Sequence, residues 1–220
     1  MKKIRIWSIC LVWLAVMCVG FASAESSTYD ALCEKSAVNR EDAAAWLEIS
    51  GTSFCQPIMQ HSLDDSYYST HNANDEESET GALYTQKTYN SKDFSDPVTI
   101  VYGSSQTDGA PFRNLQELYS GQFEDCREIM MYLPEETRQY EVFAAVPYSS
   151  IHILHYYNFS SEQRFESFFN SAYSTRLLGM HLVEENRPEF EDKILILSTG
   201  LRGDKMQRYL VMAKLVTDER

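Results

Sequence analysis

The side chains that could carry covalent or acid–base chemistry are scattered along this chain. Serine hydroxyls and cysteine thiols are nucleophile types, and imidazoles are the bases that most often activate them. The candidates are Ser104, Ser105, Ser198, Cys55 and Cys126 as nucleophiles, and His61, His71, His152, His155 and His181 as bases. No local signature of a nucleophile–base pair surrounds any of them. Spacing alone therefore defines no catalytic pair.

The cysteines predict neither a metal site nor a full set of disulfides. Cys10 and Cys18 lie in the N-terminal apolar segment, which leaves Cys33, Cys55 and Cys126 for the folded part. Three thiols cannot all pair with one another, and their spacing fits no zinc site. A Cys33–Cys126 bridge stays open as an alternative, and Cys55 is predicted to be a small buried side chain in a strand. We predict no metal and no organic cofactor.

Residues 61–80 form a polar stretch rich in carboxylates. The acidic residues are Asp64, Asp65, Asp75, Glu76, Glu77 and Glu79. Their spacing does not match the calcium loop of helix–loop–helix sites. We interpret the stretch as a solvated loop, with calcium dependence as the open alternative.

The N-terminus has the pattern of an export segment. Lys2, Lys3 and Arg5 form a basic start, residues 6–21 are almost wholly apolar, and Ala22-Ser23-Ala24 offers a small-residue cleavage site. Residues 1–24 are therefore predicted to be a signal peptide, or else an uncleaved membrane anchor. Either alternative places the rest of the chain outside the cytoplasm, with membrane contact only through this segment.

The composition is that of an acidic, folded domain. Hydrophobic residues make up 44% of the 220 residues, which suffices for a core. The net charge is −13, and removal of residues 1–24 takes away three cations and no anion, which leaves −16. Such a surface repels the phosphates of nucleic acid, so we predict no nucleic-acid partner.

Short runs of β-branched and aromatic residues predict a mostly β fold with added helices. The predicted strands are 46–49, 53–60, 81–84, 98–102, 140–146, 193–198 and 209–216. One helix is predicted around 115–119, and a second from Ser160, where Ser160 and Gln163 form a capping box. Residues 25–45 are predicted as a helical lead-in, because Asn39 precedes two acidic residues and three alanines. Residues 46–220 then form a closed or nearly closed antiparallel barrel.

Seven groups of residues, taken in chain order, carry a resemblance to a known family: 46–52; 57–60 with Asp65, 67–68 and His71; 80–84; 98–103; 108–109 with Phe112 and Leu115; 194–199; and 208–211. They resemble segments of class B sortases, which are bacterial surface transpeptidases that cut a sorting signal and join the protein to the cell wall or a pilus. They cover most of residues 40–216. The resemblance implies a sortase-like closed β-barrel of about eight strands.

Two positions depart from the family pattern. In the family, the tyrosine-glycine pair after one strand is followed by the catalytic histidine, and here Ser104 follows Tyr102-Gly103. In the family, the serine-threonine pair ends in the catalytic cysteine, and here Gly200 follows Ser198-Thr199. Of the three catalytic positions that the resemblance implies, Arg208 alone is retained. The resemblance also implies a substrate-binding role for Ser198, Thr199 and Arg208.

The missing thiol decides the functional expectation. Sortase chemistry, as the resemblance implies it, begins with attack of a thiolate on a peptide carbonyl, and Gly200 has no side chain to supply one. We therefore interpret the chain as an exported, catalytically inactive sortase homologue that binds a sorting-signal peptide, a pilin or a partner sortase at the cell surface. The alternatives are an active transpeptidase or peptidase with relocated catalytic residues, and a surface protein whose groove has collapsed.

Overall fold

The computed structural model describes residues 27–174 and 180–216. The strands are β1 Ala43–Ile49, β2 Cys55–Met59, β3 Leu83–Tyr84, β4 Val98–Tyr102, β5 Glu128–Tyr132, β6 Thr137–Ser149, β7 His181–Leu182, β8 Ile194–Leu201 and β9 Asp204–Leu215. The α-helices are α1 Thr28–Lys35, α2 Leu115–Gly121, α3 Ile153–Tyr156 and α4 Glu162–Ser174, with short 3-10 turns at Tyr67–Ser69, Glu124–Cys126 and Glu184–Asn186.

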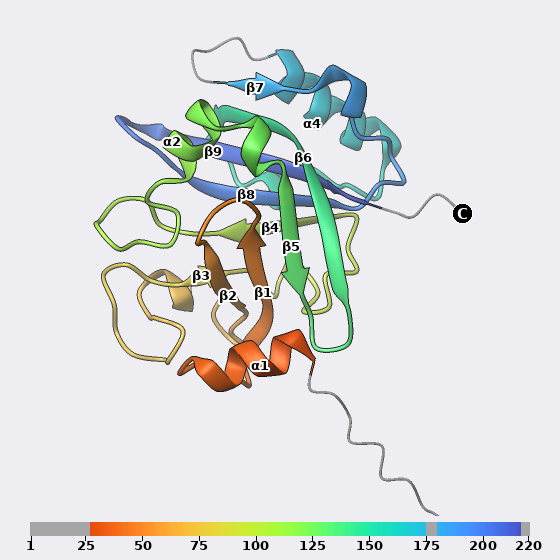
Figure 1. Cartoon of the computed structure of the whole chain (residues 1–220). Coiled ribbons are helices and arrows are strands. Elements are labelled where there is room, and N and C mark those ends of the chain that lie inside the picture. The colour runs from red at the N-terminus through yellow and green to blue at the C-terminus, as the bar shows by residue number, and fades with distance from the viewer. Residues whose placement is uncertain (1–26, 175–179, 217–220) are drawn as a thin grey trace, which may run out of the picture.

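The strands close into a barrel. Their order is β5-β1-β2-β3-β4-β8-β9-β6, and β6 also pairs with β5, so the first and last strands meet. β7 pairs antiparallel with β6 and is not one of the eight strands of the barrel. Most pairs are antiparallel, but β2–β3 and β4–β8 are parallel. The eight-stranded closed barrel predicted from the sequence is confirmed (Figure 1).

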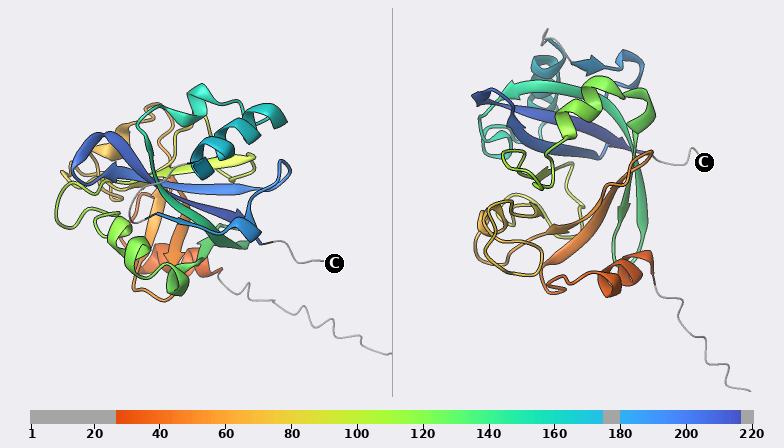
Figure 2. Two further views of the ribbon diagram at one scale, coloured as in Figure 1. Left: turned by 90° about the horizontal axis from the view of Figure 1, so that it is seen from above. Right: turned by 60° about the vertical axis from the view of Figure 1, so that its left-hand side comes forward.

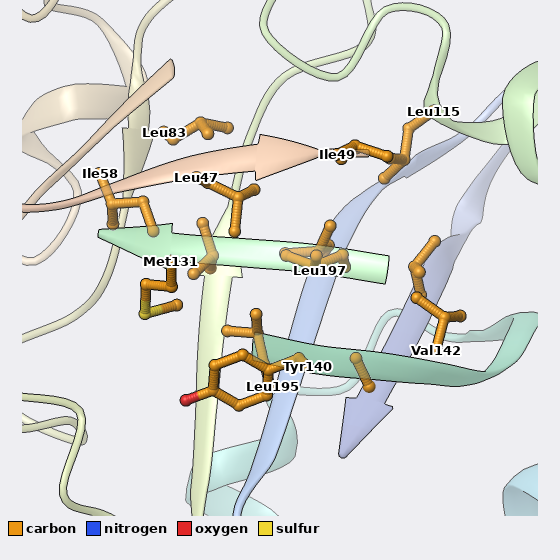
Figure 3. Close-up of a cluster of buried hydrophobic side chains, with 14 of the residues drawn as sticks. Leu47, Ile49, Ile58, Leu83, Leu115, Met131, Tyr140, Val142, Leu195 and Leu197 are labelled. Atoms are coloured by element: carbon orange, nitrogen blue, oxygen red, sulfur yellow. The ribbon is translucent and has the colours of Figure 1, made fainter. Parts of the chain in front are cut away.

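One hydrophobic core fills the barrel. Side chains from all sides of the sheet point toward one another there, including Leu47, Met131, Tyr140, Leu195 and Leu197 (Figure 3). Each of these five is at most 3% exposed. Close packing of this kind fixes the direction of every strand end, because the strands cannot shift without opening voids.

A second core lies on the outer face of the sheet, under α4. Successive residues of a strand point to opposite faces, so Ile194 and Ile196 face α4 while their neighbours face the barrel interior. The aromatic stripe of α4 meets them with Phe165, Phe168 and Phe169, all fully buried. Figures 1 and 2 show α4 and α1 on opposite sides of the barrel.

The prediction of a helical lead-in over residues 25–45 is wrong for its second half. The helix α1 ends at Lys35, and the three alanines begin strand β1. Ala43 packs under α1, while Ala44 and Ala45 pack in the barrel interior, because the strand shifts register between Ala43 and Ala45. Helix propensity is a weak preference that such burial overrides.

The second predicted helix begins slightly later than the sequence indicates. α4 starts at Glu162, and the backbone carbonyl of Ser161 accepts from Phe165 N. Ser160 therefore precedes the residue that caps the helix, and its own N–H donates to Asn158 Oδ1.

Residues 1–24 lie outside the described residues, so the structure does not test the export segment. Within residues 27–174 and 180–216, no helix is long and apolar enough to cross a membrane.

Candidate functional site

The candidate site forms where the parallel strands β4 and β8 end. Tyr102 stands beside Ser198 in the parallel register, and Gly103 N donates to Ser198 O at 3.2 Å. The two chain segments that follow therefore leave the sheet at the same edge. Ser105 Oγ then donates to Gly200 O at 3.0 Å, which holds the two segments together.

Gly103 allows the chain to leave β4 at this point. A Cβ atom there would lie 2.4 Å from Phe112 Cδ2 and 2.7 Å from Leu83 Cδ2, both in buried core residues. Only a residue without a side chain fits between them. The glycine before Ser104 is thus required by packing and places Ser104 at the edge of the site.

Strand alternation puts Gly200 and Arg208 on the same outer face. The two residues are directly paired between β8 and β9, and Ser198 lies two residues before Gly200 on that face. Residues on this side of the sheet continue the surface that α4 covers further along the strands. The site is therefore outside the barrel, beyond the end of the outer core.

Arg208 is held by Ser198 and by an aromatic ring. Its Nε donates to Ser198 Oγ at 2.6 Å and its Nη2 donates to Ser198 O at 3.2 Å. The guanidinium carbon lies 5.4 Å from the centre of the Tyr102 ring, and Tyr102 stacks on Tyr84 at 5.6 Å. Cation–π contact of this kind orients a guanidinium without neutralising it.

Burial affects the charges at this position. It lowers the pKa of the Arg208 guanidinium from its ordinary value and raises the pKa of Tyr102 to about 12. Tyr102 therefore stays neutral, and arginine remains charged at any physiological pH. Among the described residues, no carboxylate lies within 4.0 Å of the Arg208 nitrogens. The result is a half-buried cation that has no counter-ion in the part of the chain that the structure describes.

Ser104 stabilises the turn after β4. Its hydroxyl accepts from Gln106 N at 3.3 Å, and its carbonyl accepts from Phe112 N at 2.9 Å. A serine hydroxyl that caps a backbone turn in this way is a structural group and a poor acid or base near neutral pH.

Gln106 is a site residue that the sequence did not indicate. A Cβ atom on Gly200 would lie 2.8 Å from Gln106 Nε2, so the amide end of Gln106 stands over Gly200 where a side chain would begin. No motif marks a lone glutamine in a turn. Only the fold of residues 103–113 back over β8 brings it here.

A cavity of about 490 Å³ lies over Gly200. Its walls come from the turn after β4, from Ser150 after β6, and from the connected ends of β8 and β9. The lining residues are Ser105, Gln106, Arg113, Ser150, Gly200, Leu201, Arg202, Gly203, Asp204, Lys205, Gln207 and Arg208. No groove separates β8 from β9, because these strands are hydrogen-bonded neighbours. The hollow lies over their paired ends.

Two predicted substrate-binding residues do not line this cavity. Thr199 is fully buried and points into the barrel, because it alternates with Ser198 and pairs with Tyr209. The geometry therefore does not support a direct role for Thr199 in peptide binding. Ser198 is also fully buried, and its hydroxyl is taken by Arg208. It acts on any ligand only by positioning that guanidinium.

We predict that Thr199→Val stabilises the protein by about 1 kcal/mol and leaves ligand affinity unchanged. In the described part of the chain, Thr199 Oγ1 is buried without a hydrogen-bond partner, and valine keeps the shape without that hydroxyl. Urea unfolding measures the first effect and peptide titration the second. A loss of peptide affinity in Thr199→Val would show that Thr199 contributes to binding.

The remaining thiols lie away from the cavity. Cys33, Cys55 and Cys126 are all free, so the Cys33–Cys126 bridge is wrong. Cys33 Sγ accepts from Trp46 Nε1 at 3.3 Å beneath α1, and Cys126 belongs to the barrel core. Cys55 is half-buried at the start of β2, and burial raises the pKa of its thiol. None of these thiols is among the cavity-lining residues.

The histidines also serve other contacts. His61 and His71 stack on the two faces of Tyr67, with ring centres 4.2 Å and 3.9 Å away. His152 Nε2 is paired with Gln86 Oε1 at 2.8 Å, and His181 stacks on Phe123. His155 contacts Tyr89 through Nδ1 at 3.4 Å. The described lining of the cavity over Gly200 contains no imidazole.

Two carboxylates of the acidic loop accept hydrogen bonds from within the loop. Asp64 accepts from Ser66 N and Oγ, and Asp75 accepts from the Tyr67 hydroxyl at 2.6 Å. In residues 27–174 and 180–216, no group of three or more His, Cys, Asp or Glu side chains is arranged to hold a metal ion.

This barrel, with its hollow at the ends of β4 and β8, has the architecture of a sortase. Sortase B of Listeria monocytogenes is 28% identical over 182 residues, which cover 80% of this chain and 71% of that protein. Sortase B of Bacillus anthracis in complex with AAEK1 is 26% identical, with a TM-score of 0.65 over 85% of this chain and 83% of that one. A Staphylococcus aureus sortase B–substrate complex is 21% identical, with a TM-score of 0.68 over 87% and 85%.

No family model matches the sequence. The curated relative and the solved structures nevertheless agree that this chain is similar to the class B sortases in sequence and in fold.

Proposed function

We propose that this protein is an exported sortase homologue without transpeptidase activity, which binds a sorting-signal peptide in the cavity over Gly200. The N-terminal basic and apolar pattern supports export. The absence of a side chain at Gly200, at the position where the family resemblance implies the nucleophile, supports the loss of chemistry.

The single observation that carries peptide binding is Arg208. A desolvated guanidinium without a counter-ion is costly unless a ligand completes its hydrogen bonds. Two of its N–H directions are taken by Ser198, and the guanidinium has five donors. The others are available for a peptide carbonyl or carboxylate. The adjoining hollow of about 490 Å³ has the size of a small-ligand site.

The location of the thiols supports binding over relocated catalysis. Catalysis by a relocated cysteine requires its thiol and a base within about 3 Å of one another and of the bound carbonyl. Cys33 and Cys126 are buried in other clusters, and Cys55 lies in β2 beside Glu48 and Tyr132. A ligand lying over Gly200 would therefore meet hydroxyls, amides and cations.

The test is titration of the full chain, purified in mild detergent, with synthetic peptides that carry the sorting signals of surface proteins from the same organism. We expect saturable binding without cleavage. Arg208→Ala is expected to weaken binding 10- to 100-fold, because it removes a charge-assisted hydrogen bond from a half-buried position.

Arg40→Ala is the matched control. Arg40 is an exposed arginine that pairs with Asp30 of α1, on the far side of the barrel from the outer core. It should bind like the wild type. The proposal fails if no peptide of the set shows saturable binding, or if Arg208→Ala and Arg40→Ala bind equally well.

A further inference from the structure

The cavity over Gly200 gathers positive charge on a strongly negative protein. The chain has a net charge of −13, yet the lining contains Arg113, Arg202, Lys205 and Arg208 against the single carboxylate of Asp204. Positive charge that is concentrated in a hollow attracts anions more strongly than isolated positive charges on the surface do. The ligand chemistry that fits this charge distribution is anionic.

The rim cations already have protein partners. Arg113 Nε lies 3.1 Å from Asp108 Oδ1, and Arg202 is ion-paired with Glu117 of α2. Both carboxylates are exposed to solvent. Arg202 N also donates to Gln116 Oε1, so the turn between β8 and β9 is fixed against α2. These contacts shape the wall of the cavity and leave little charge unneutralised at the rim.

Arg208 and Lys205 differ from the rim cations. In the described part of the chain, neither has a carboxylate within 4.0 Å. Asp204 is the acidic residue of the lining, and its oxygens accept from Met206 N at 2.8 Å and Gln207 Nε2 at 3.0 Å. The donors to Asp204 are neutral, so this carboxylate keeps its charge, and the β9 side of the cavity carries two cations against one anion.

The remaining surface next to Arg208 is neutral. Gly200 carries no side chain, and the Gln106 amide nitrogen above it is a donor. The site therefore presents hydrogen-bond donors and cations to its ligand. An internal peptide segment would offer them only a neutral carbonyl. A carboxylate accepts bidentate hydrogen bonds from a guanidinium, and these are about twice as strong as bonds to neutral acceptors.

We propose that the cavity over Gly200 recognises a peptide by its free C-terminal carboxylate, with Arg208 as the direct partner and Lys205 as the second cation. This inference rests on the peptide-binding function proposed above and names the form of the ligand. The protein would then hold a chain end, such as the product of an earlier cleavage, rather than an uncut internal segment. The class of reaction that supplies such a ligand is peptide-bond hydrolysis.

The test compares two forms of one peptide. The tightest-binding peptide of the sorting-signal set is shortened from its C-terminus one residue at a time. Each product is made as the free acid and as the C-terminal amide, with an acetylated N-terminus. The full chain is titrated with both forms by isothermal calorimetry. We expect one shortened free acid to bind about tenfold more tightly than its amide.

Variants locate the origin of the preference. Arg208→Gln should bind acid and amide equally, Lys205→Gln should reduce the preference in part, and Arg40→Gln should keep it whole. Thermal melting confirms that each variant is folded, and Arg208→Lys, which retains the charge, should keep part of the preference if Arg208→Gln is unstable. The preference should also shrink as salt is raised, because salt screens the carboxylate.

Two negative results are distinguishable. Equal affinity for acid and amide in the wild type, or an acid preference that persists in folded Arg208→Gln, overturns the carboxylate inference and leaves peptide binding intact. Failure of every peptide in both forms to bind overturns the proposed function together with the inference.

Discussion

The triple substitution Ser104→His, Gln106→Ala and Gly200→Cys is expected to produce slow peptide cleavage, an activity that we expect the wild type to lack. Gly200 faces Arg208 across β8 and β9, so a thiol there would stand beside a guanidinium that can stabilise an oxyanion. Ser104 lies at the same edge of the sheet, one residue before the hydroxyl that bonds Gly200 O. The Gln106 change is needed because its amide occupies the space of the new side chain.

The expected gain is large but far from complete. Removal of a nucleophile costs on the order of 10⁶ in rate in a well-studied protease. Restored groups in an unoptimised surrounding should recover a small part of that factor, about 10²-fold above the wild-type background. Fluorescence release from a quenched sorting-signal peptide measures it, and alkylation of the new thiol should abolish it.

Two controls separate the restored site from a thiol placed at random. Ser104→His with Gln106→Ala, which lacks the thiol, should stay inert. Ser150→Cys introduces a thiol elsewhere in the cavity lining and should also stay inert. Robust turnover by the wild type would contradict the proposed loss of catalysis. A folded triple variant whose thiol is reactive toward alkylation but cleaves nothing would show that the cavity no longer orients a peptide for attack.

Phe168→Ala is expected to lower the free energy of unfolding by about 3–5 kcal/mol. Phe168 is fully buried. The centre of its ring lies 5.3 Å, 5.2 Å, 5.3 Å and 5.0 Å from the ring centres of Tyr148, Tyr157, Phe159 and Phe169, respectively. Truncation removes all of these contacts and leaves a cavity between α4 and the outer face of the sheet. Urea unfolding followed by circular dichroism measures the loss.

Gln163→Ala is the matched control on the same helix. Its side chain is exposed, so the change should stay within about 0.5 kcal/mol. A cost below about 1 kcal/mol for Phe168→Ala would mean that α4 is not held by this aromatic cluster in solution. It would then follow that the outer core contributes little to the position of β8 and β9.

The strands that carry the site were predictable because each is a short β-branched or aromatic run. β4 has the predicted bounds, and the predicted segment 193–198 overlaps β8. The order of these segments along the chain also carried the family resemblance. Local composition therefore sufficed for parts of β8 and β9, and the family resemblance supplied the closed barrel of about eight strands.

Other features depended on contacts that sequence patterns do not contain. The alanines of β1 have high helix propensity, and only their burial between α1 and the barrel makes them a strand. β5 was not predicted, because it gains its place by pairing with both β1 and β6. The residues of the candidate site differed from those predicted for the same reason. Thr199 points inward by strand alternation, and Gln106 reaches Gly200 only through the turn after β4.

The parallel pairing of β4 with β8 separates the packed interior from the two positions where the family resemblance implies catalytic side chains. Val101 and Leu197 point into the barrel and are fully buried, whereas positions 104 and 200 lie past the ends of the packed region. A single replacement at either position removes no interior contact. A lineage can therefore lose its chemistry through one or two mutations and pass on an intact scaffold, free to be selected for holding molecules that its ancestors transformed.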